Sequence, residues 1–150
     1  MVKSVIIREV MPNDALRLVE LSRQLGYSIS VSEMQANIEM CLNDSQYKIF
    51  ITEIKQEVCG FIGLITARWL HRNGSWAKVL SLVVNEQQRG LKIGSQLLTF
   101  AENYVKAQGC DKIELVSGLH RRQSGAHQFY LNHGYESDLT QYFVKKLSKE

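Results

Sequence analysis

The stretch from Trp76 to Val105 constrains the fold of this chain more than any other segment. It begins with an extended run that is apolar on both faces and ends at Val84, as expected of a strand covered on both sides. A basic turn containing Gly90 and Gly94 follows. The next apolar residues recur with the period of a helix, at Leu97, Leu98, Ala101, Tyr104 and Val105. This order predicts a domain in which helices pack against a sheet.

The other segments supply further strands and helices. Short apolar and β-branched runs predict strands over residues 5–10, 47–54, 58–70, 76–84, 112–117 and 141–147. Helices are predicted over residues 12–25, from Ser32 with Gln35 completing a capping box, after Gly94, and over residues 123–133. The second of these helices is predicted to bury Met34, Ile38, Cys41 and Leu42. The fold class is therefore α+β, with a largely antiparallel sheet.

Length and composition exclude several classes of protein. The 150 residues suit one domain, taken as residues 1–150, and 45% apolar with 22% charged residues is ordinary globular usage. A net charge of +3 is too small to imply a nucleic-acid partner. No apolar run approaches the roughly 20 residues of a membrane span, and the N-terminus does not resemble a secretory signal. Three cysteines without C-x-x-C spacing indicate neither a disulfide framework nor a metal site. We therefore expect a reduced, soluble, cytoplasmic protein.

The turn before the predicted helix has the chemistry of a phosphate site. Glycines allow a ligand close to the backbone, the helix start offers N–H donors, and Arg89 and Lys92 add positive charge. An ordinary helix-entry turn is the alternative interpretation. The segment fails the P-loop pattern, because Ser95 follows Gly94 directly, and it lacks the three glycines of a dinucleotide fingerprint.

Two motifs together resemble the GCN5-related N-acetyltransferase (GNAT) family. The first runs from Leu82 to Leu98 and matches the family's acetyl-CoA pattern Arg/Gln-x-x-Gly-x-Gly/Ala at Arg89, Lys92 and Gly94, with lysine in place of the central glycine. The second, residues 126–135, is similar to Ala-x-x-Phe-Tyr-x-x-x-Gly-Phe/Tyr. The resemblance implies a single GNAT-type domain with a mixed, mostly antiparallel sheet of about six to seven strands, four flanking helices, and fourth and fifth strands that splay apart.

The resemblance also implies a site for acetyl-CoA, which would be a cosubstrate, with no metal. The pantetheine arm would pair with the fourth strand, the pyrophosphate would lie on the turn, and two residues of the fourth helix would border the arm. These cofactor-binding residues are Leu82, Val83, Val84, Arg89, Gly90, Leu91, Lys92, Ile93, Gly94, Ser95, Gln123 and Ser124.

Family logic makes Tyr130 the catalytic acid, which protonates the departing thiolate of coenzyme A. A phenol with a pKa of about 10 can donate to a thiolate whose acid has a pKa of about 8.5. A core aromatic residue beside Phe129 is the alternative. The base stays open: the fourth strand has no Asp or Glu, and His71 and His120 are candidates that also suit ordinary loop positions. Trp69 and Trp76 suit either an acceptor pocket or packing.

The sequence thus predicts an acetyl-CoA-dependent N-acetyltransferase that acts on a primary amine by direct attack in a ternary complex. Two alternatives are a non-catalytic acyl-CoA sensor on the same scaffold and a phosphate-binding structural module. The acceptor, a small molecule or a peptide amine, is left open by the residues. Members of the family commonly dimerise, so a homodimer is one of the oligomeric states that the sequence allows.

Overall fold

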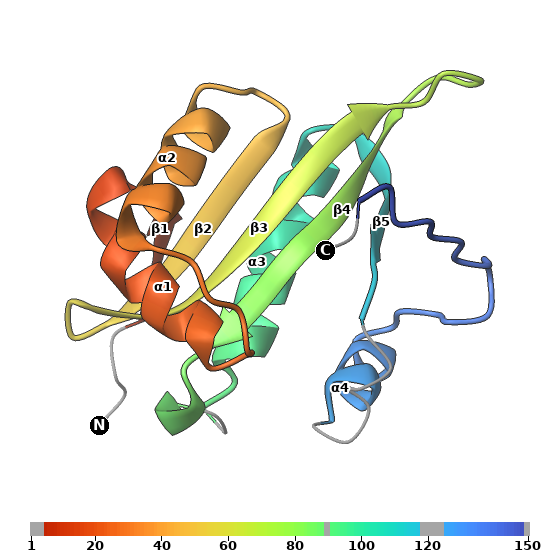
Figure 1. Ribbon diagram of the computed structural model, residues 1–150. Helices are drawn as coiled ribbons and strands as arrows, with labels where there is room; N and C mark the ends of the chain where they lie inside the picture. The colour runs from red at the N-terminus through yellow and green to blue at the C-terminus, as the bar shows by residue number, and fades with distance from the viewer. Residues whose placement is uncertain (1–4, 89–90, 118–124, 149–150) are drawn as a thin grey trace. The chain divides into compact units, whose positions relative to one another are not determined.

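The computed structural model describes residues 5–88, 91–117 and 125–148 (Figure 1). The chain divides into two compact units, Met1–Val116 and Ser117–Glu150. The first unit holds a five-stranded sheet and three of the helices, and the second holds one short helix, α4 (Ala126–Asn132). None of the helices in the described ranges is long and apolar enough to cross a membrane.

The sheet has the strand order β1–β2–β3–β4–β5, so neighbours in sequence are neighbours in space. The first four strands pair antiparallel, and the last pair is parallel. Their bounds are β1 (Val5–Glu9), β2 (Tyr47–Ile54), β3 (Glu57–Arg68), β4 (Ser75–Val84) and β5 (Cys110–Leu115). A parallel neighbour needs a crossover connection, and α3 (Ile93–Ala107) supplies it between β4 and β5. The predicted α+β class with a mixed, mostly antiparallel sheet is confirmed.

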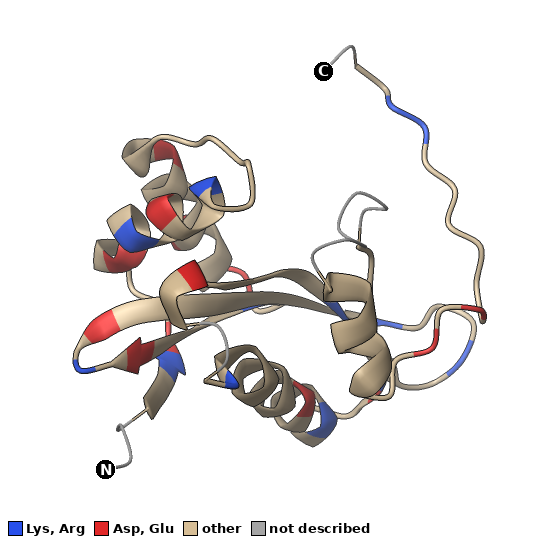
Figure 2. Ribbon diagram, turned by 90° about the horizontal axis from the view of Figure 1, so that it is seen from below, with Lys and Arg blue, Asp and Glu red and all other residues tan. Residues whose placement is uncertain are grey.

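Helices cover both faces of the sheet. Figure 2 shows α1 (Ala15–Arg23) and α2 (Val31–Leu42) on one side and α3 on the other. The helix α3 turns its predicted apolar side inward, and Ile93, Leu97, Leu98, Ala101 and Val105 are buried. Positions of basic and acidic residues are mixed along α1 and α2 in Figure 2.

An ion-pair cluster fixes the start of α1 to β1. The two terminal guanidinium nitrogens of Arg8 each lie 2.9 Å from an oxygen of the Asp14 carboxylate, and the Arg8 side chain also pairs with Glu53 of β2. The backbone N–H of Met11 donates to Asp14 at 2.7 Å. Burial opposes ionisation of Asp14, but the hydrogen bonds from Arg8 and Met11 outweigh it and hold the pKa of this carboxyl below its usual value. The cluster therefore positions the first helix on the sheet.

The predicted start of α2 is wrong by two residues. The helix is capped by Ser30, whose Oγ accepts from the N–H of Glu33 at 3.1 Å, while the Glu33 carboxylate accepts from the N–H of Ser30 at 3.0 Å. The chain offers two overlapping capping boxes, and the acidic one forms because a carboxylate suits the positive end of a helix. The predicted buried stripe is also too wide, because only Ile38 is buried and Leu42 is 42% exposed.

The predicted strand over residues 141–147 is absent from the structure, where this stretch is irregular. The sheet therefore has five strands in the described ranges instead of six to seven. The apolar run that predicted the strand includes Phe143 and Val144, which are exposed by 84% and 70%. An apolar run forms a strand of a sheet only where a neighbouring backbone completes the hydrogen-bond ladder. The fourth helix begins at Ala126, and its predicted first residues, 123–124, lie outside the described part of the chain.

Candidate active site

The sheet opens between β4 and β5, as the family resemblance implied. Parallel pairing runs from Ser75 opposite Cys110 to Val79 opposite Leu115, where β5 ends. Beyond Val79, β4 continues to Val84 and pairs only with β3 among the strands that the structure describes. A strand edge of this kind presents N–H and C=O groups that can pair with an extended ligand.

A bulge marks the place where the two strands part. On β3, Leu64 lies opposite Val79 and Gly63 lies opposite Ser81, so Leu80 is the extra residue of β4. A bulge bends its strand and re-aims the side chains next to it. The predicted pantetheine-pairing residues, Leu82 to Val84, follow directly after this bulge.

Asn85 anchors the turn that leaves β4. Its backbone N–H donates to the carbonyl of Cys59 at 2.7 Å, and its side chain accepts from the N–H of Gln87 at 3.2 Å. The carbonyl of Asn85 accepts from the N–H of Gln88 at 2.9 Å, which closes a 3-10 turn over Glu86–Gln88. Asn85 is 93% buried by these neighbours, with 7% of its surface exposed. The path of the turn is therefore fixed where it begins.

Gln24, at the end of α1, hydrogen-bonds to the same turn through its side chain. Its amide nitrogen lies 3.3 Å from the Asn85 side-chain oxygen, and its amide oxygen accepts from the N–H of Glu86 at 2.9 Å. Neither Gln24 nor Asn85 is among the site residues that the sequence predicted. No local pattern signals them, because they are separated by 61 residues and meet only through the fold.

Replacing Gln24 with alanine is expected to lower the free energy of unfolding by about 0.5–1.5 kcal/mol. It is also expected to weaken a few-fold the binding of coenzyme A, the ligand that the family resemblance implies for this turn. The variant removes the two hydrogen bonds that Gln24 makes to Asn85 and Glu86. Isothermal titration with coenzyme A and denaturant unfolding measure the two effects. Gln35→Ala, an exposed glutamine of α2, is the matched control. Equal affinity in both variants would contradict a positioning role for Gln24.

The predicted phosphate site includes the first turn of α3. Lys92 precedes the helix with a φ of +62°, a left-handed conformation that favours glycine, and its side chain makes no capping hydrogen bond in the described structure. The N–H groups of a first helical turn have no partners within the helix and lie at its positive end. Gly94 and Ser95 belong to this turn, and both are partly exposed. Arg89 and Gly90 lie outside the described residues.

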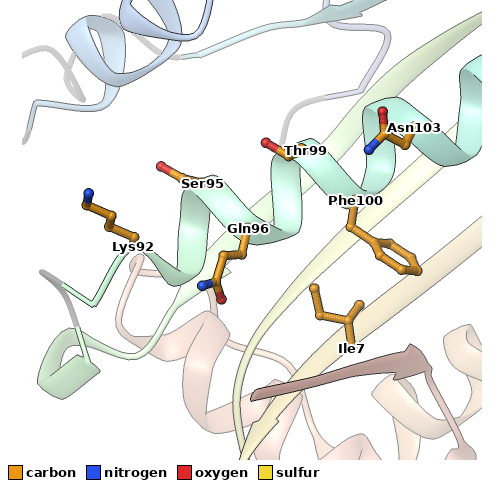
Figure 3. Close-up of a pocket in the computed structure, with 7 residues that line it drawn as sticks. All are labelled: Ile7, Lys92, Ser95, Gln96, Thr99, Phe100 and Asn103. Carbon is orange, nitrogen blue, oxygen red and sulfur yellow. The ribbon is translucent and has the colours of Figure 1, made fainter. Parts of the chain in front are cut away.

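A shallow hollow of about 450 Å³ runs beside the first turns of α3 (Figure 3). Figure 3 shows Gln96 and Phe100 pointing towards Ile7 of β1, whereas Lys92, Ser95 and Thr99 point to the other side of the helix. The two groups are separated because residues three or four apart share one face of a helix. Two of the predicted cofactor residues, Lys92 and Ser95, thus share a polar stripe that begins at the helix start.

Tyr130 belongs to the second unit, where aromatic neighbours hold it. Its ring centroid lies 5.2 Å from that of Phe129 and 5.9 Å from that of Tyr135. Its carbonyl accepts from the N–H groups of His133 and Tyr135 at 3.0 Å and 3.1 Å. This packing orients the phenol and is compatible with both predicted roles, so the acid role stays a prediction. Gln123 and Ser124 lie outside the described residues.

The structure adds no base candidate on β4, which carries no carboxylate. His71 is exposed in the β3–β4 connection, where its ring lies 5.5 Å from that of Trp69. His120 lies outside the described residues. Among the residues that the structure describes, no group of three or more His, Cys, Asp or Glu side chains could hold a metal ion.

The tryptophans Trp69 and Trp76 pack against each other, with ring centroids 5.9 Å apart. The indole N–H of Trp69 donates to Asp111 at 3.1 Å. The guanidinium of Arg72 lies 4.1 Å from the Trp69 ring centroid and pairs with Asp111 at 2.6 Å. These contacts tie the β3–β4 connection to β5, which accounts for the tryptophans as packing residues.

Comparison with known proteins places this site in context. A sequence model of the acetyltransferase (GNAT) family matches residues 16–135. The chain is 41% identical over 80 residues to the aminoalkylphosphonate N-acetyltransferase of Salmonella typhimurium. These 80 residues are 53% of this chain and 51% of that protein. The match therefore spans about half the length of that relative.

Two solved structures show the same fold. A GNAT family acetyltransferase from Staphylococcus aureus superposes with a TM-score of 0.81 at 24% identity, covering 96% of this chain and 99% of the other. An aminoglycoside N-acetyltransferase in complex with CoA gives a TM-score of 0.82 at 15% identity, covering 99% and 98%. The family match includes both sequence motifs and most of the chain, so the chain belongs to the acetyltransferase (GNAT) family.

Proposed function

We propose that this chain is an acetyl-CoA-dependent N-acetyltransferase that acetylates a primary amine by direct attack in a ternary complex. The observation that carries the proposal is the edge of β4 after Val79, which pairs only with β3 among the described strands and precedes the 3-10 turn Glu86–Gln88 and the helix α3. We also propose that both compact units form one domain over residues 1–150. The family match supports this, because it continues across the boundary between the units.

The described residues fit the chemistry of coenzyme A. Its pantetheine arm carries amides, which suit the open backbone of Leu82–Val84. Its pyrophosphate suits a helix start with adjacent positive charge, here the N–H groups of residues 91–95 with Lys92. Arg89, Gly90, Gln123 and Ser124 complete the proposed contacts.

Acetyl-CoA supplies an acetyl thioester that an amine can attack directly, with coenzyme A released as a thiol. The backbone of β4 orients the thioester, and a backbone N–H there stabilises negative charge on the carbonyl oxygen. The Tyr130 hydroxyl donates its proton to the departing sulfur, and the proton that the attacking amine loses restores the phenol. This transfer is compatible with typical pKa values of about 10 for a phenol and about 8.5 for a thiol.

Kinetics with a panel of amines test this proposal. Thiol release that depends on both acetyl-CoA and an amine, with intersecting double-reciprocal plots, is the expected result, because a ping-pong pattern indicates a covalent acetyl-enzyme. A sensor would bind acetyl-CoA without thiol release in the presence of any amine. A phosphate-binding module would bind ADP as tightly as acetyl-CoA. Either result would contradict the proposed activity.

Lys92→Gly is expected to separate the backbone role of this position from its charge. Glycine removes the cost of a left-handed residue, so the free energy of unfolding should rise by up to about 1 kcal/mol. Loss of the ammonium should weaken coenzyme A binding by about 1 kcal/mol or less, as for a partly exposed pair. The control Lys92→Ala loses the charge and keeps the Cβ, so it should show only the second effect. A much larger loss of affinity in both variants would make Lys92 central to binding, and a gain would show that it obstructs the site.

A further inference from the structure

A second cavity, of about 400 Å³, lies on the side of the sheet that α1 and α2 cover. It is enclosed by α1, α2, the connection between them, and strands β2, β3 and β4. Tyr27, from the helix connection, contributes to its wall and is 63% exposed. This volume is in the range of small-molecule sites.

The lining of this cavity is apolar and uncharged. Phe61, Leu64 and Val83 line it with exposures of 6%, 1% and 4%. Among its described lining residues there is no Lys, Arg, His, Asp or Glu, and the polar side chains are serines, tyrosines and one cysteine. A charged group placed here would lose water without gaining an ionic partner, which is strongly unfavourable. The lining therefore selects for an uncharged, largely apolar occupant.

The cavity borders the part of β4 that the proposed function uses. Leu80, Ser81 and Val83 line it, and they alternate with or adjoin Leu82 and Val84. Successive side chains of a strand point to opposite faces, so an occupant here lies against the backbone proposed to orient the thioester. The bulge at Leu80 contributes directly to the lining.

We propose that this cavity binds the apolar body of the acceptor, so that the acceptor is an aryl-alkyl or alkyl amine without a second charged group. This inference rests on the proposed function. The absence of acid–base side chains from the described lining supports it further. An ammonium ion that enters an apolar cavity is desolvated, which lowers its pKa and favours the neutral, nucleophilic amine. The Salmonella relative is named for an aminoalkylphosphonate, an anionic class that this lining disfavours.

Binding can be tested without any turnover, through Cys41. This thiol lines the cavity and is partly exposed, whereas Cys110 is partly exposed and does not belong to the lining. Burial raises the pKa of the Cys41 thiol, as does the nearby charge of Asp44, so alkylation by iodoacetamide is followed at pH 8.5 or above. We expect 2-phenylethylamine to slow labelling of Cys41 at least threefold and to leave Cys110 unchanged. No protection, or equal protection by 2-aminoethylphosphonate, overturns the inference.

Specificity is tested with the same two amines as acceptors. The value of kcat/KM should be at least tenfold higher for 2-phenylethylamine than for 2-aminoethylphosphonate, and the reverse order overturns the inference. Selective protection of Cys41 without turnover of any amine would support the cavity assignment and contradict the proposed function. Turnover of 2-aminoethylphosphonate without selective protection would support the function and contradict the cavity assignment.

Two variants of cavity-lining residues test whether the amine acceptor binds in the cavity. A Cβ on Gly63 would lie 3.3 Å from the Ser81 hydroxyl, which can rotate away, so Gly63→Val should narrow the cavity and raise KM for 2-phenylethylamine at least tenfold. Tyr27→Ala removes an exposed side chain from the cavity wall and leaves the packing of the hydrophobic core unchanged, and it should raise the same KM at least threefold. Coenzyme A affinity should change less than twofold in both. Leu16→Ala, a half-exposed leucine of α1 outside the lining, is the control. Unchanged KM values in both variants overturn the inference.

Discussion

Replacing Tyr130 with phenylalanine is expected to lower kcat by about 10²–10⁴-fold, or somewhat less, because a positioned general acid contributes in that range. The lower end suits a thiolate, which is already a tolerable leaving group near pH 8. The substitution keeps the ring that packs between Phe129 and Tyr135, so stability and coenzyme A affinity should change little. Because the lost interaction forms mainly in the transition state, kcat and kcat/KM should fall together.

Tyr135→Phe is the matched control for this experiment. It deletes a hydroxyl from the aromatic neighbour of Tyr130, at a position where the family motif accepts phenylalanine, and near-normal turnover is expected. If Tyr130 is only a packing residue, Tyr130→Phe will keep full activity, and only Tyr130→Ala will lose activity. Steady-state kinetics of the three variants with one verified amine separate the two interpretations.

The part of the fold that local patterning controls was predictable. Residues 47–54 form β2 with the predicted bounds, because a short β-branched run between turn residues has few alternatives. The helix α3 buries the predicted side because its apolar residues follow the helical period. The parting of β4 and β5 was also expected, but only from the family resemblance.

The features that depend on long-range pairing were not predictable. The bulge at Leu80 is visible only once the register of β3 against β4 is known. The same holds for the link from Gln24 to Asn85, since either residue alone suits an exposed turn. At Ser30 and Ser32, two capping boxes compete within one segment, and a small electrostatic preference decides between them.

The uncharged cavity was likewise beyond sequence reasoning. Its lining comes from six elements, and each lining side chain alone suits an ordinary core position. The sequence allowed an acceptor pocket or packing for Trp69 and Trp76. Their contacts with each other and with Asp111 fit the packing alternative. The residue types alone were compatible with packing of the two tryptophans. Only the three-dimensional fold shows which side chains line the uncharged cavity.

Replacing Gly94 with valine is expected to weaken coenzyme A binding at least about a hundredfold while the chain stays folded. Gly94 lies in the first helical turn of α3, a conformation that valine adopts without strain, so the fold should tolerate it. The new side chain would stand where the pyrophosphate is proposed to approach the N–H groups. Losing two charge-assisted hydrogen bonds, at about 1.5–3 kcal/mol each, accounts for this loss. Isothermal titration measures the affinity, and circular dichroism with thermal unfolding verifies the fold.

Gln96→Val provides the control for Gly94→Val, because it introduces the same side chain into the same helix on a different face. Gln96 points towards Ile7 and away from the stripe of Lys92 and Ser95 (Figure 3). The Gln96→Val variant should therefore bind coenzyme A with an affinity close to that of the wild-type protein. Salt gives a second, independent criterion. Part of the attraction at the helix start is between charges, so affinity in the unchanged chain should fall as ionic strength rises. A folded Gly94→Val variant that binds coenzyme A normally would remove the first turn of α3 from the proposed site, whatever the salt dependence.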